Sequence, residues 1–353
     1  MDTFEWKPVA ESWKGVGIYL LTCMVADRRP LLGTLSWDGQ KACICRTWLG
    51  NEVVEKFLEL PARFPQMQCL AFQVMPDHFH GVLYVKEELP VSIRMVVRGF
   101  RQGCSKKYRE YLGNTIAGQW TKGGGAEKHG QGMPGEQAAN VAGQWTKRGD
   151  AASVHASSSV EPQFNCGTMP GTLFTDYHLR SLAHKGQLRA MIAYVHDNPR
   201  RMAAKRANAD RFRVRRGVSV EGMTFDAVGN MHLLERPLWA VHCRRVWSEE
   251  ETRTYQNRCI LAARKGAVLV GAFISKTEKA VLDEARKEQL PIIHLMQNGF
   301  PEVYKPYGKD FDACAAGLLL QLAPWPFYSE RKTITREQCQ RLNLMAEKIA
   351  LKQ

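Results

Sequence analysis

One segment of the chain, residues 113–172, constrains the fold more than any other feature because it divides the sequence in two. Gly, Ala, Ser and Gln dominate it, and the hexapeptide Ala-Gly-Gln-Trp-Thr-Lys occurs at 117–122 and again at 142–147. Two copies are too few for a repeat fold, and this composition offers little apolar surface to offset the entropy of ordering. We therefore expect a disordered insertion within a domain assembled from the sequence on both sides of it.

The sequence before the insertion alternates between strand and helix patterns. Strand-forming residues fill 16–25, and two apolar runs with β character occupy 68–85 on either side of Met75-Pro76-Asp77. Apolar residues at helical spacing predict helices over 51–60, which Pro61 ends, and over 91–111. After the insertion, residues 187–197 carry a helical apolar stripe, and a basic stretch runs from 198 to 216.

The net charge of +14 is concentrated in one part of the chain. Residues 173–265 carry 18 Lys and Arg against 9 Asp and Glu, whereas 113–172 carry 4 of each. A concentrated basic region attracts phosphate backbones and favours a nucleic-acid partner. A solubilising surface would explain the same charge.

The cysteines and the apolar runs indicate in which cellular compartment the protein is expected. The ten cysteines include no Cys-x-x-Cys pair, so we expect reduced thiols and no cysteine zinc site. The longest apolar runs are too short to span a bilayer, and the first residues lack a secretory pattern. We expect a cytoplasmic protein without a membrane partner.

Two histidines lie inside the second apolar β run, in the sequence His78-Phe79-His80. Residues two apart in a strand point to the same face, so the two imidazoles converge while Phe79 turns into the core. Such a pair suits a divalent metal with open positions for substrate. Two solvent-facing histidines are the alternative interpretation.

A second motif, Tyr194-Val195-His196-Asp197-Asn198-Pro199, ends the helical stripe of 187–197. Tyr194 and Asn198 are four residues apart and share a helix face, and Pro199 stands where a helix is expected to bend or end. A tyrosine nucleophile beside an amide ligand would fit this spacing. Taken alone, Tyr194 equally fits a half-buried aromatic that completes the stripe.

Together the two motifs resemble those of the HUH single-tyrosine transposases, in particular the REP-associated branch. Met75 to His80 matches that family's Met-Pro-(Asn/Asp)-His-x-His, and Tyr194 to Pro199 matches its Tyr-Ile-x-x-Asn-Pro. Thr22 to Gly33 is similar to the family's first strand and turn. The resemblance covers roughly residues 13–245, and the insertion is its main departure.

The resemblance implies an α+β fold, a ferredoxin-like antiparallel sheet with helices on one side and the histidines on a central strand. It further implies that His78, His80 and Asn198 bind Mg²⁺ or Mn²⁺ and that Tyr194 is the nucleophile. Tyr108, Tyr111 and Tyr177 compete for that last role, but the first two follow the histidines too closely to match the family's order. The implied product is a 5′-phosphotyrosine link that a second 3′-hydroxyl can reverse.

The implied substrate is single-stranded DNA that presents a hairpin. Basic and aromatic residues near both motifs are the expected contacts, and a homodimer is compatible with the sequence. The candidate DNA-binding residues are Arg101, Tyr177, His178, Arg180, Arg189, Arg200, Arg201, Arg213, Arg215 and Arg216. A replication initiator or relaxase, and a domesticated DNA-binding protein that no longer cuts, are the competing hypotheses.

The last part of the chain falls outside these motifs. A strand over 267–274, a helix opened by Ser275 with Glu278 three residues on, and a strand over 291–296 predict a β-α-β unit with a parallel sheet. This segment faintly resembles the Rossmann-like DNA-processing protein A group, and the helix start near Ser275 could hold a phosphate. We therefore expect a nuclease domain over 1–112 and 173–245, and a small Rossmann-like α/β domain over 246–353 that binds a ligand or only orients the nuclease.

Overall fold

The computed structural model describes residues 16–38, 41–120, 171–182, 184, 186–243, 248–330 and 333–351. Within these residues the chain is a mixture of helices and sheets, and it divides into two compact units, Met1–Pro199 and Arg200–Gln353. Most of the expected insertion, residues 121–170, lies outside the described residues. Its first eight residues, 113–120, belong to a helix.

The first unit is built on a four-stranded antiparallel sheet with the spatial order β4-β5-β1-β6. Its strands are β1 (Gly17–Val25), β4 (Met67–Met75), β5 (His78–Val85) and β6 (Phe174–Ser181). Along the chain, these strands alternate with helices in the order β-α-β-β-α-β. A separate hairpin, β2 (Gly33–Trp37) and β3 (Ala42–Arg46), follows the one-turn helix Ala26–Arg28. As expected, the two apolar runs around Met75-Pro76-Asp77 form neighbouring strands, with β5 inside the sheet.

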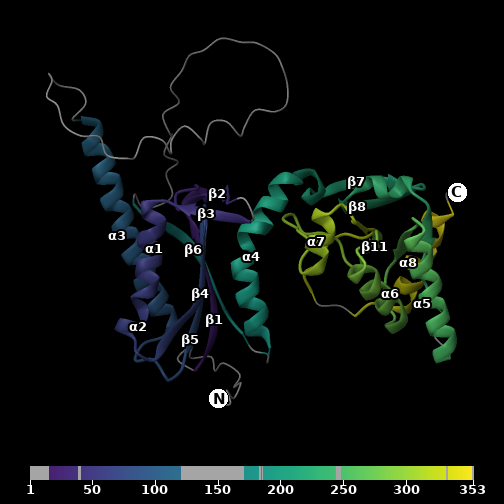
Figure 1. The fold of residues 1–353 in the computed structure, drawn as a ribbon, viewed down its shortest axis with the longest axis horizontal. Coiled ribbons are helices and arrows are strands. Elements are labelled where there is room, and N and C mark those ends of the chain that lie inside the picture. The colour runs from purple at the N-terminus through teal and green to yellow at the C-terminus, as the bar shows by residue number, and fades with distance from the viewer. Residues whose placement is uncertain are drawn as a thin grey trace, which may run out of the picture. The chain divides into compact units, whose positions relative to one another are not determined.

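Helices cover both faces of this sheet (Figure 1). They are α1 (Trp48–Leu58), α2 (Leu60–Arg63), α3 (Ile93–Trp120) and α4 (Gln187–Ala207). Phe57 of α1 and Phe100 of α3 pack with Phe79 in the core of one face. The stripe of α4, including Val195, packs on the other face against Ile18. The expectation of helices on one side was therefore wrong, because the apolar stripe of α4 buries the face that α1 and α3 leave open.

Pro199 and Gly81 each determine a local feature of the first unit. Helix α4 continues through Pro199 to Ala207 instead of ending there. Gly81 follows the histidines on β5, and a Cβ atom at this position would lie 2.5 Å from the Phe57 ring. The missing side chain lets α1 approach the central strand closely.

The second unit contains a six-stranded sheet with the order β7-β8-β12-β11-β10-β9. Its strands are β7 (Arg215–Val220), β8 (Met223–Gly229), β9 (Leu238–Ala240), β10 (Val268–Gly271), β11 (Ile292–Leu295) and β12 (Leu319–Ala323). Strands β9 to β12 pair in parallel, and the β7–β8 hairpin joins β12 antiparallel. The predicted β-α-β unit and its parallel pairing are confirmed.

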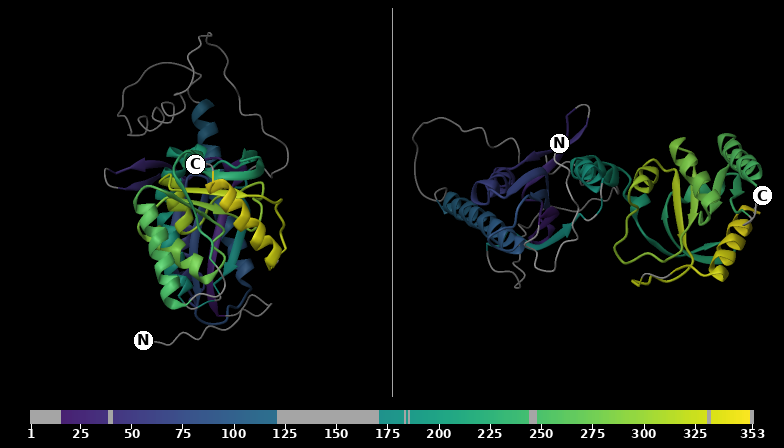
Figure 2. Two further views of the ribbon diagram at one scale, coloured as in Figure 1. Left: turned by 90° about the vertical axis from the view of Figure 1, so that its right-hand side faces the viewer. Right: turned by 90° about the horizontal axis from the view of Figure 1, so that it is seen from below.

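Helices cover both faces of this sheet (Figure 2), and apolar strand residues are buried on each face. The helices are α5 (Glu249–Arg264), α6 (Lys276–Lys287), α7 (Lys309–Ala315) and α8 (Arg336–Ala350). Leu269 packs with α5, α6 and α7, whereas its neighbours Val268 and Val270 pack with α8. Because successive strand residues point to opposite faces, a strand that is buried on both faces has a continuous run of apolar residues in its sequence. Two short 3-10 helices, Ala209–Phe212 and Met231–Glu235, complete the unit.

The boundary between the units differs from the one expected from the sequence. We expected the second domain to begin at residue 246, but the units divide between Pro199 and Arg200. The cause is strand pairing: β8 bonds to β12, and β9 bonds to β10, so these strands belong to the second sheet. The helix α4 runs across the boundary without a break.

The start of α6 forms the predicted capping box, but it is not an open phosphate site. Ser275 Oγ accepts from Glu278 N, and the buried Glu278 carboxylate accepts from the backbone N–H groups of Ser275, Ile274 and Cys243. The hypothesis of a phosphate nest here was therefore wrong, because the side chain of Glu278 already fills the anion position. Among the described residues, no helix is long and apolar enough to cross a membrane.

Candidate functional site

The two histidines of β5 lie on the sheet face that α4 covers. Phe79 is fully buried with Phe57 on the opposite face, at a ring separation of 5.0 Å. His78 and His80 therefore share the other face, and their ring centroids are 4.8 Å apart. The prediction that these imidazoles converge is confirmed. His80 is buried and His78 is partly exposed.

Strand register surrounds the histidine pair with polar residues. Thr22 of β1 stands directly opposite His80 on one side, and Gln73 of β4 stands opposite it on the other. On the far side of β1, Thr22 pairs with His178 of the edge strand β6. Because directly paired residues point to the same face, this row extends from β4 to β6.

Each histidine is held through its Nδ1 atom. The Thr22 hydroxyl lies 2.9 Å from Nδ1 of His80, and an Asp77 carboxylate oxygen lies 2.7 Å from Nδ1 of His78. Hydrogen bonds of this kind fix the orientation of metal-binding imidazoles and leave Nε2 as the atom that ligates. Both rings are thus arranged to present Nε2.

Asp77 also contacts Arg28, at 3.3 Å. Burial raises the pKa of Asp77, but the hydrogen bond and charge of His78, together with the charge of Arg28, outweigh this effect and lower the pKa below its ordinary value. The carboxylate therefore stays ionised beside His78. Sequence reasoning named neither Thr22 nor Asp77 as a site residue, although Asp77 lies within the recognised motif.

Helix α4 brings Tyr194 to the histidines. The ring of Tyr194 lies 6.1 Å from the ring of His80, centroid to centroid. Val195 is fully buried against the sheet, and Leu188, Met191 and Ile192 pack beside it, as the predicted stripe requires. Tyr194 thus belongs to the packed face of α4 and also adjoins the histidine pair.

Asn198 lies one turn after Tyr194 and is buried. Its amide nitrogen donates to the carbonyl oxygens of Tyr194 (2.9 Å) and Val195 (3.2 Å). Pro199 has no N–H to offer the Val195 carbonyl four residues before it, so the Asn198 side chain replaces the missing donor and the helix continues. With the nitrogen committed to the helix, Oδ1 is the atom through which Asn198 could ligate a metal.

The competing tyrosines lie elsewhere in the first unit. Tyr108 of α3 is buried in the core, and its hydroxyl accepts from Arg29 at 2.8 Å. Tyr111 stacks on Trp48 of α1 at 6.2 Å. Tyr177 packs with the same core as α3. These three side chains belong to the sheet face that α1 and α3 cover, opposite the histidines, so of the four candidates only Tyr194 adjoins them.

The candidate DNA-binding residues of the first unit fall into two groups. Arg101 of α3 donates to the Phe174 carbonyl at 2.7 Å and covers the Tyr177 ring at 4.8 Å, which gives both residues a packing role away from the histidines. His178 and Arg180 alternate with Tyr177 on β6 and therefore lie on the histidine face, both exposed. Arg189 is exposed on α4.

The candidate arginines after Pro199 belong to the second unit, where most of them bind protein groups. Arg200 pairs with Asp312 at 2.7 Å, and Arg201 lies over the Phe311 ring at 3.7 Å. Arg215 pairs with Asp210, and Arg216 pairs with Asp226 and donates to two backbone carbonyls. Arg213 is exposed. Asp226 and Asp312 lie outside the basic stretch, so the stretch is less one-sided in the fold than in the sequence.

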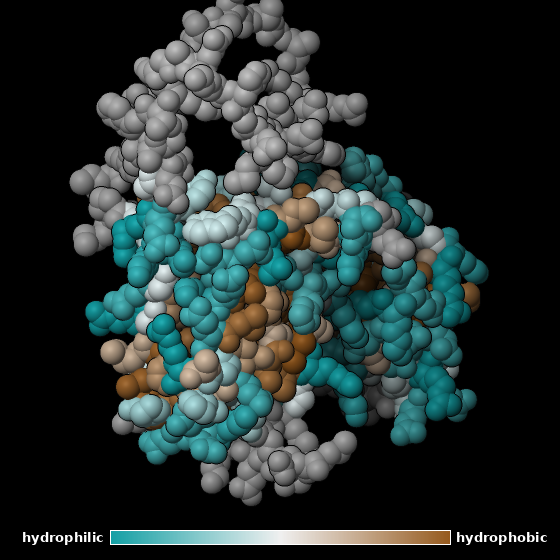
Figure 3. Space-filling view, turned by 60° about the vertical axis from the view of Figure 1, so that its left-hand side comes forward, coloured by the Kyte–Doolittle hydropathy of each residue, from teal (hydrophilic) through white to brown (hydrophobic). Residues whose placement is uncertain are grey.

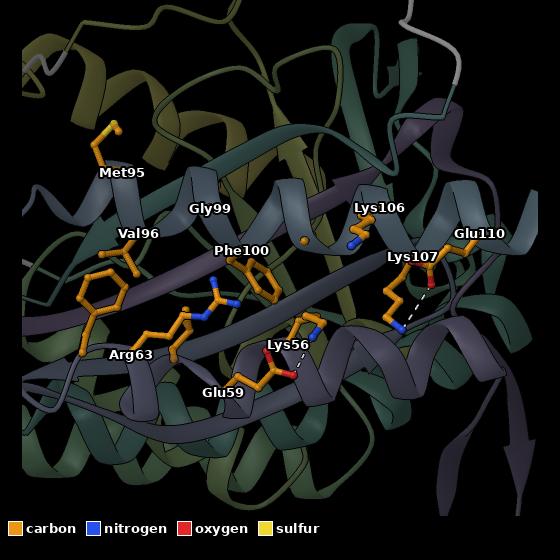
Figure 4. A pocket seen from close by; sticks show the side chains of 13 residues that line it. Lys56, Glu59, Arg63, Met95, Val96, Gly99, Phe100, Lys106, Lys107 and Glu110 are labelled. Carbon is orange, nitrogen blue, oxygen red and sulfur yellow. Dashed lines mark hydrogen bonds and ion pairs between the residues drawn. The ribbon is translucent and has the colours of Figure 1, made fainter.

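A groove of about 310 Å³ between α3 and the α1–α2 pair is separate from this site. Figure 4 shows Arg63, Val96 and Phe100 facing it, with Lys56 of α1 bonded to Glu59, which follows that helix. An apolar area bordered by hydrophilic side chains is also visible on the face turned forward in Figure 3. Since Val96 and Phe100 pack with Phe79, the groove lies on the sheet face opposite the histidines.

Among the described residues, no group of three or more His, Cys, Asp and Glu side chains is placed to hold a metal. The ligand set expected here differs from such a group, because it consists of two imidazoles and the amide oxygen of Asn198. The hydrogen bonds at both Nδ1 atoms orient the imidazoles in a way that fits a divalent ion. No family model matches the chain, and no curated protein matches it either.

Proposed function

We propose that this protein is a metal-dependent endonuclease and strand transferase of single-stranded DNA, in which Tyr194 is the nucleophile. The observation that carries the proposal is the meeting of Tyr194 with His78 and His80 on one sheet face, with both Nδ1 atoms already held. Two motifs more than a hundred residues apart in sequence converge there. The competing tyrosines do not share this surface.

The proposal extends to the fold. The order β-α-β-β-α-β and the sheet order β4-β5-β1-β6 support a ferredoxin-like sheet of the HUH nuclease kind in the first unit. In the second unit, four parallel strands with helices on both faces support a Rossmann-like arrangement.

The metal would be held by Nε2 of His78, Nε2 of His80 and Oδ1 of Asn198. When bound there, Mg²⁺ or Mn²⁺ polarises the scissile phosphate and stabilises the charge that develops on it. Thr22 and Asp77 keep the two imidazoles in position, and Asp77 adds a fixed negative charge behind His78.

Tyr194 carries the covalent step. Its hydroxyl oxygen attacks phosphorus and loses its proton, the bond from phosphorus to the 3′ oxygen breaks, and that leaving oxygen takes up a proton. The product is a 5′-phosphotyrosine link and a free 3′-hydroxyl. Because the link retains the phosphodiester energy, a second 3′-hydroxyl can reverse the step and join strands.

Incubation of the full chain with hairpin single strands labelled at the 3′ end and Mn²⁺ tests the proposal. We expect a labelled band that stays with the protein on a denaturing gel and that chelation with EDTA prevents. Tight binding of the same strands without any adduct would contradict cleavage and favour the alternative, a DNA-binding protein that does not cut.

A further inference from the structure

The second unit contains a pocket of about 450 Å³ that none of the sequence motifs predicted. It opens where β10 and β11 end, because Ala272 and Phe273 follow β10, and Met296 and Gln297 follow β11. Side chains from α6 and from the start of α7 close its sides. In sheets with parallel strands, ligands bind at the carboxyl ends of the strands, and sites for small molecules occupy about 300–1,000 Å³.

A buried hydrogen-bond network forms part of the pocket wall. Tyr304 donates to Gln321 Oε1 at 2.9 Å, and Gln321 Nε2 lies 3.4 Å from Asp310 Oδ2. Arg286 of α6 pairs with the other Asp310 oxygen. Gln321 is only 1% exposed although it sits in the middle of β12. A polar network at the centre of a sheet costs desolvation, and it serves to hold pocket side chains in one geometry.

Two polar atoms beside this network lack a partner. His294 Nδ1 and Arg286 Nε are buried without a hydrogen bond to any described residue. Burial lowers the pKa of His294 to about 4, and a hydrogen bond to the backbone of Ala272 engages its ring. The imidazole is therefore neutral near pH 7. A buried polar atom without a partner is costly, and a bound ligand can supply the missing bond.

The backbone at Phe273 is also unusual. Its φ angle is +50°, a region that residues with a side chain rarely adopt, and it is buried with its ring edge-on to His294 at 5.5 Å. Such outliers cluster at binding sites, where the surrounding structure maintains them. Here the conformation places an aromatic ring beside His294.

The charged side chains of the pocket differ between its interior and its mouth. Arg286 is neutralised by Asp310 and lies 3.9 Å from Asp283. Lys279 and Lys309 line the pocket and are exposed. A ligand that fits has a flat, hydrogen-bonding head for the interior and an anionic end for the two lysines.

From these features we propose that the pocket binds a nucleoside monophosphate whose base carries an exocyclic amino group. The base lies against Phe273, its amino group donates to His294 Nδ1, and the phosphate meets Lys279 and Lys309. The site belongs to the second unit alone and stands independently of the proposed cleavage activity.

Calorimetry on the full chain tests this site with AMP, IMP, adenosine and inorganic phosphate. We expect AMP to bind at least about tenfold more tightly than each of the other three, because only AMP satisfies the lysines, the aromatic ring and His294 Nδ1 together. The variant with Lys279→Ala and Lys309→Ala should lose about tenfold in AMP affinity while its affinity for adenosine stays unchanged.

A matched variant with Lys265→Ala and Lys276→Ala controls for the charge change, since both lysines are exposed and do not line the pocket. Its AMP affinity should equal that of the wild type. Equal affinity for AMP and IMP, no saturable AMP binding at millimolar concentration, or unchanged AMP affinity in the Lys279 and Lys309 variant would each overturn the proposal. A 5′-phosphorylated dinucleotide that binds more tightly than AMP would likewise contradict a site for a single nucleotide.

Discussion

Two hydrogen bonds at Nδ1 decide which nitrogen each histidine of the site presents. Asp77 precedes His78 and is visible in the motif, whereas Thr22 reaches His80 from another strand, 58 residues earlier. Sequence therefore predicted the imidazole pair but neither of the residues that hold it, although Asp77 lies within the motif. It could not identify Thr22, because only the register between β1 and β5 places that hydroxyl beside His80.

The substitution Thr22→Val tests whether this hydroxyl orients a metal ligand. Valine keeps the shape but leaves Nδ1 of His80 without its partner, so we expect Mn²⁺ affinity to fall about tenfold. Calorimetry with Mn²⁺ measures the change, and Thr34→Val in the exposed part of β2 is the control. Equal Mn²⁺ affinity in Thr22→Val and the control would show that the hydroxyl has no part in metal binding.

His294 makes the stability of the protein depend on pH. Burial lowers its pKa from the ordinary value of 6.5 to about 4 in the folded state; the charge of Asp310 opposes this shift, and the charge of Arg286 adds to it. The unfolded chain therefore takes up a proton first, and the free energy of unfolding falls as the pH drops from about 6.5 to about 4. The melting temperature of His294→Gln should decline less over this range than that of the wild type, and parallel declines would refute the assignment.

Among the elements, α4 differs most from what its sequence suggested. Pro199 predicted an end or a bend, yet the Asn198 amide replaces the missing donor and the helix reaches Ala207. The same continuity hid the boundary between the units, since no turn or linker marks it. The basic stretch that follows could not be interpreted from its own charge alone, because its partners Asp226 and Asp312 lie outside it.

Arg216 of the β7–β8 hairpin bonds to protein groups that stabilise the second unit. Arg216 bonds to Asp226 at 2.5 Å and to the carbonyls of Phe300 and Pro301. Arg216→Ala should lower the free energy of unfolding by about 1 kcal/mol, because the side chain is half exposed and its bonds are partly screened. The exposed Arg213→Ala is the control for thermal unfolding. If Arg216→Ala instead leaves stability unchanged and weakens DNA binding with a flatter salt dependence, the arginine contacts phosphate.

At the scale of the whole molecule, local pattern predicted the elements that carry the motifs and the β10–α6–β11 unit, but not how the chain assembles. The capping box at Ser275, the parallel pair β10–β11 and the β4–β5 hairpin all form between neighbours in sequence. The pairing of β8 with β12 joins residues about 90 apart, and the periodicity of either strand carries no information about it. The nucleotide pocket was missed for the same reason, since its residues are gathered by that sheet.

Deletion of residues 121–170 with a short Gly/Ser bridge tests the hypothesis that the insertion is dispensable. We expect an unchanged melting temperature and intact cleavage, because changes of loop length cost little. A deletion that continues through Leu173 should lower stability by about 2–5 kcal/mol. Leu173 is fully buried, and its backbone bonds to Ser105 and Ala26. Loss of stability in the shorter deletion would show that the segment is structural.

The central claim, that Tyr194 is the nucleophile beside His78 and His80, is tested most directly by locating the covalent link. The adduct from hairpin single strands and Mn²⁺ is digested with nuclease and protease, and the modified peptide is identified by mass spectrometry. We predict a nucleotide on Tyr194, no adduct in Tyr194→Phe, and a normal yield in Tyr111→Phe. A nucleotide on any other residue, or full adduct formation by Tyr194→Phe, would contradict the account.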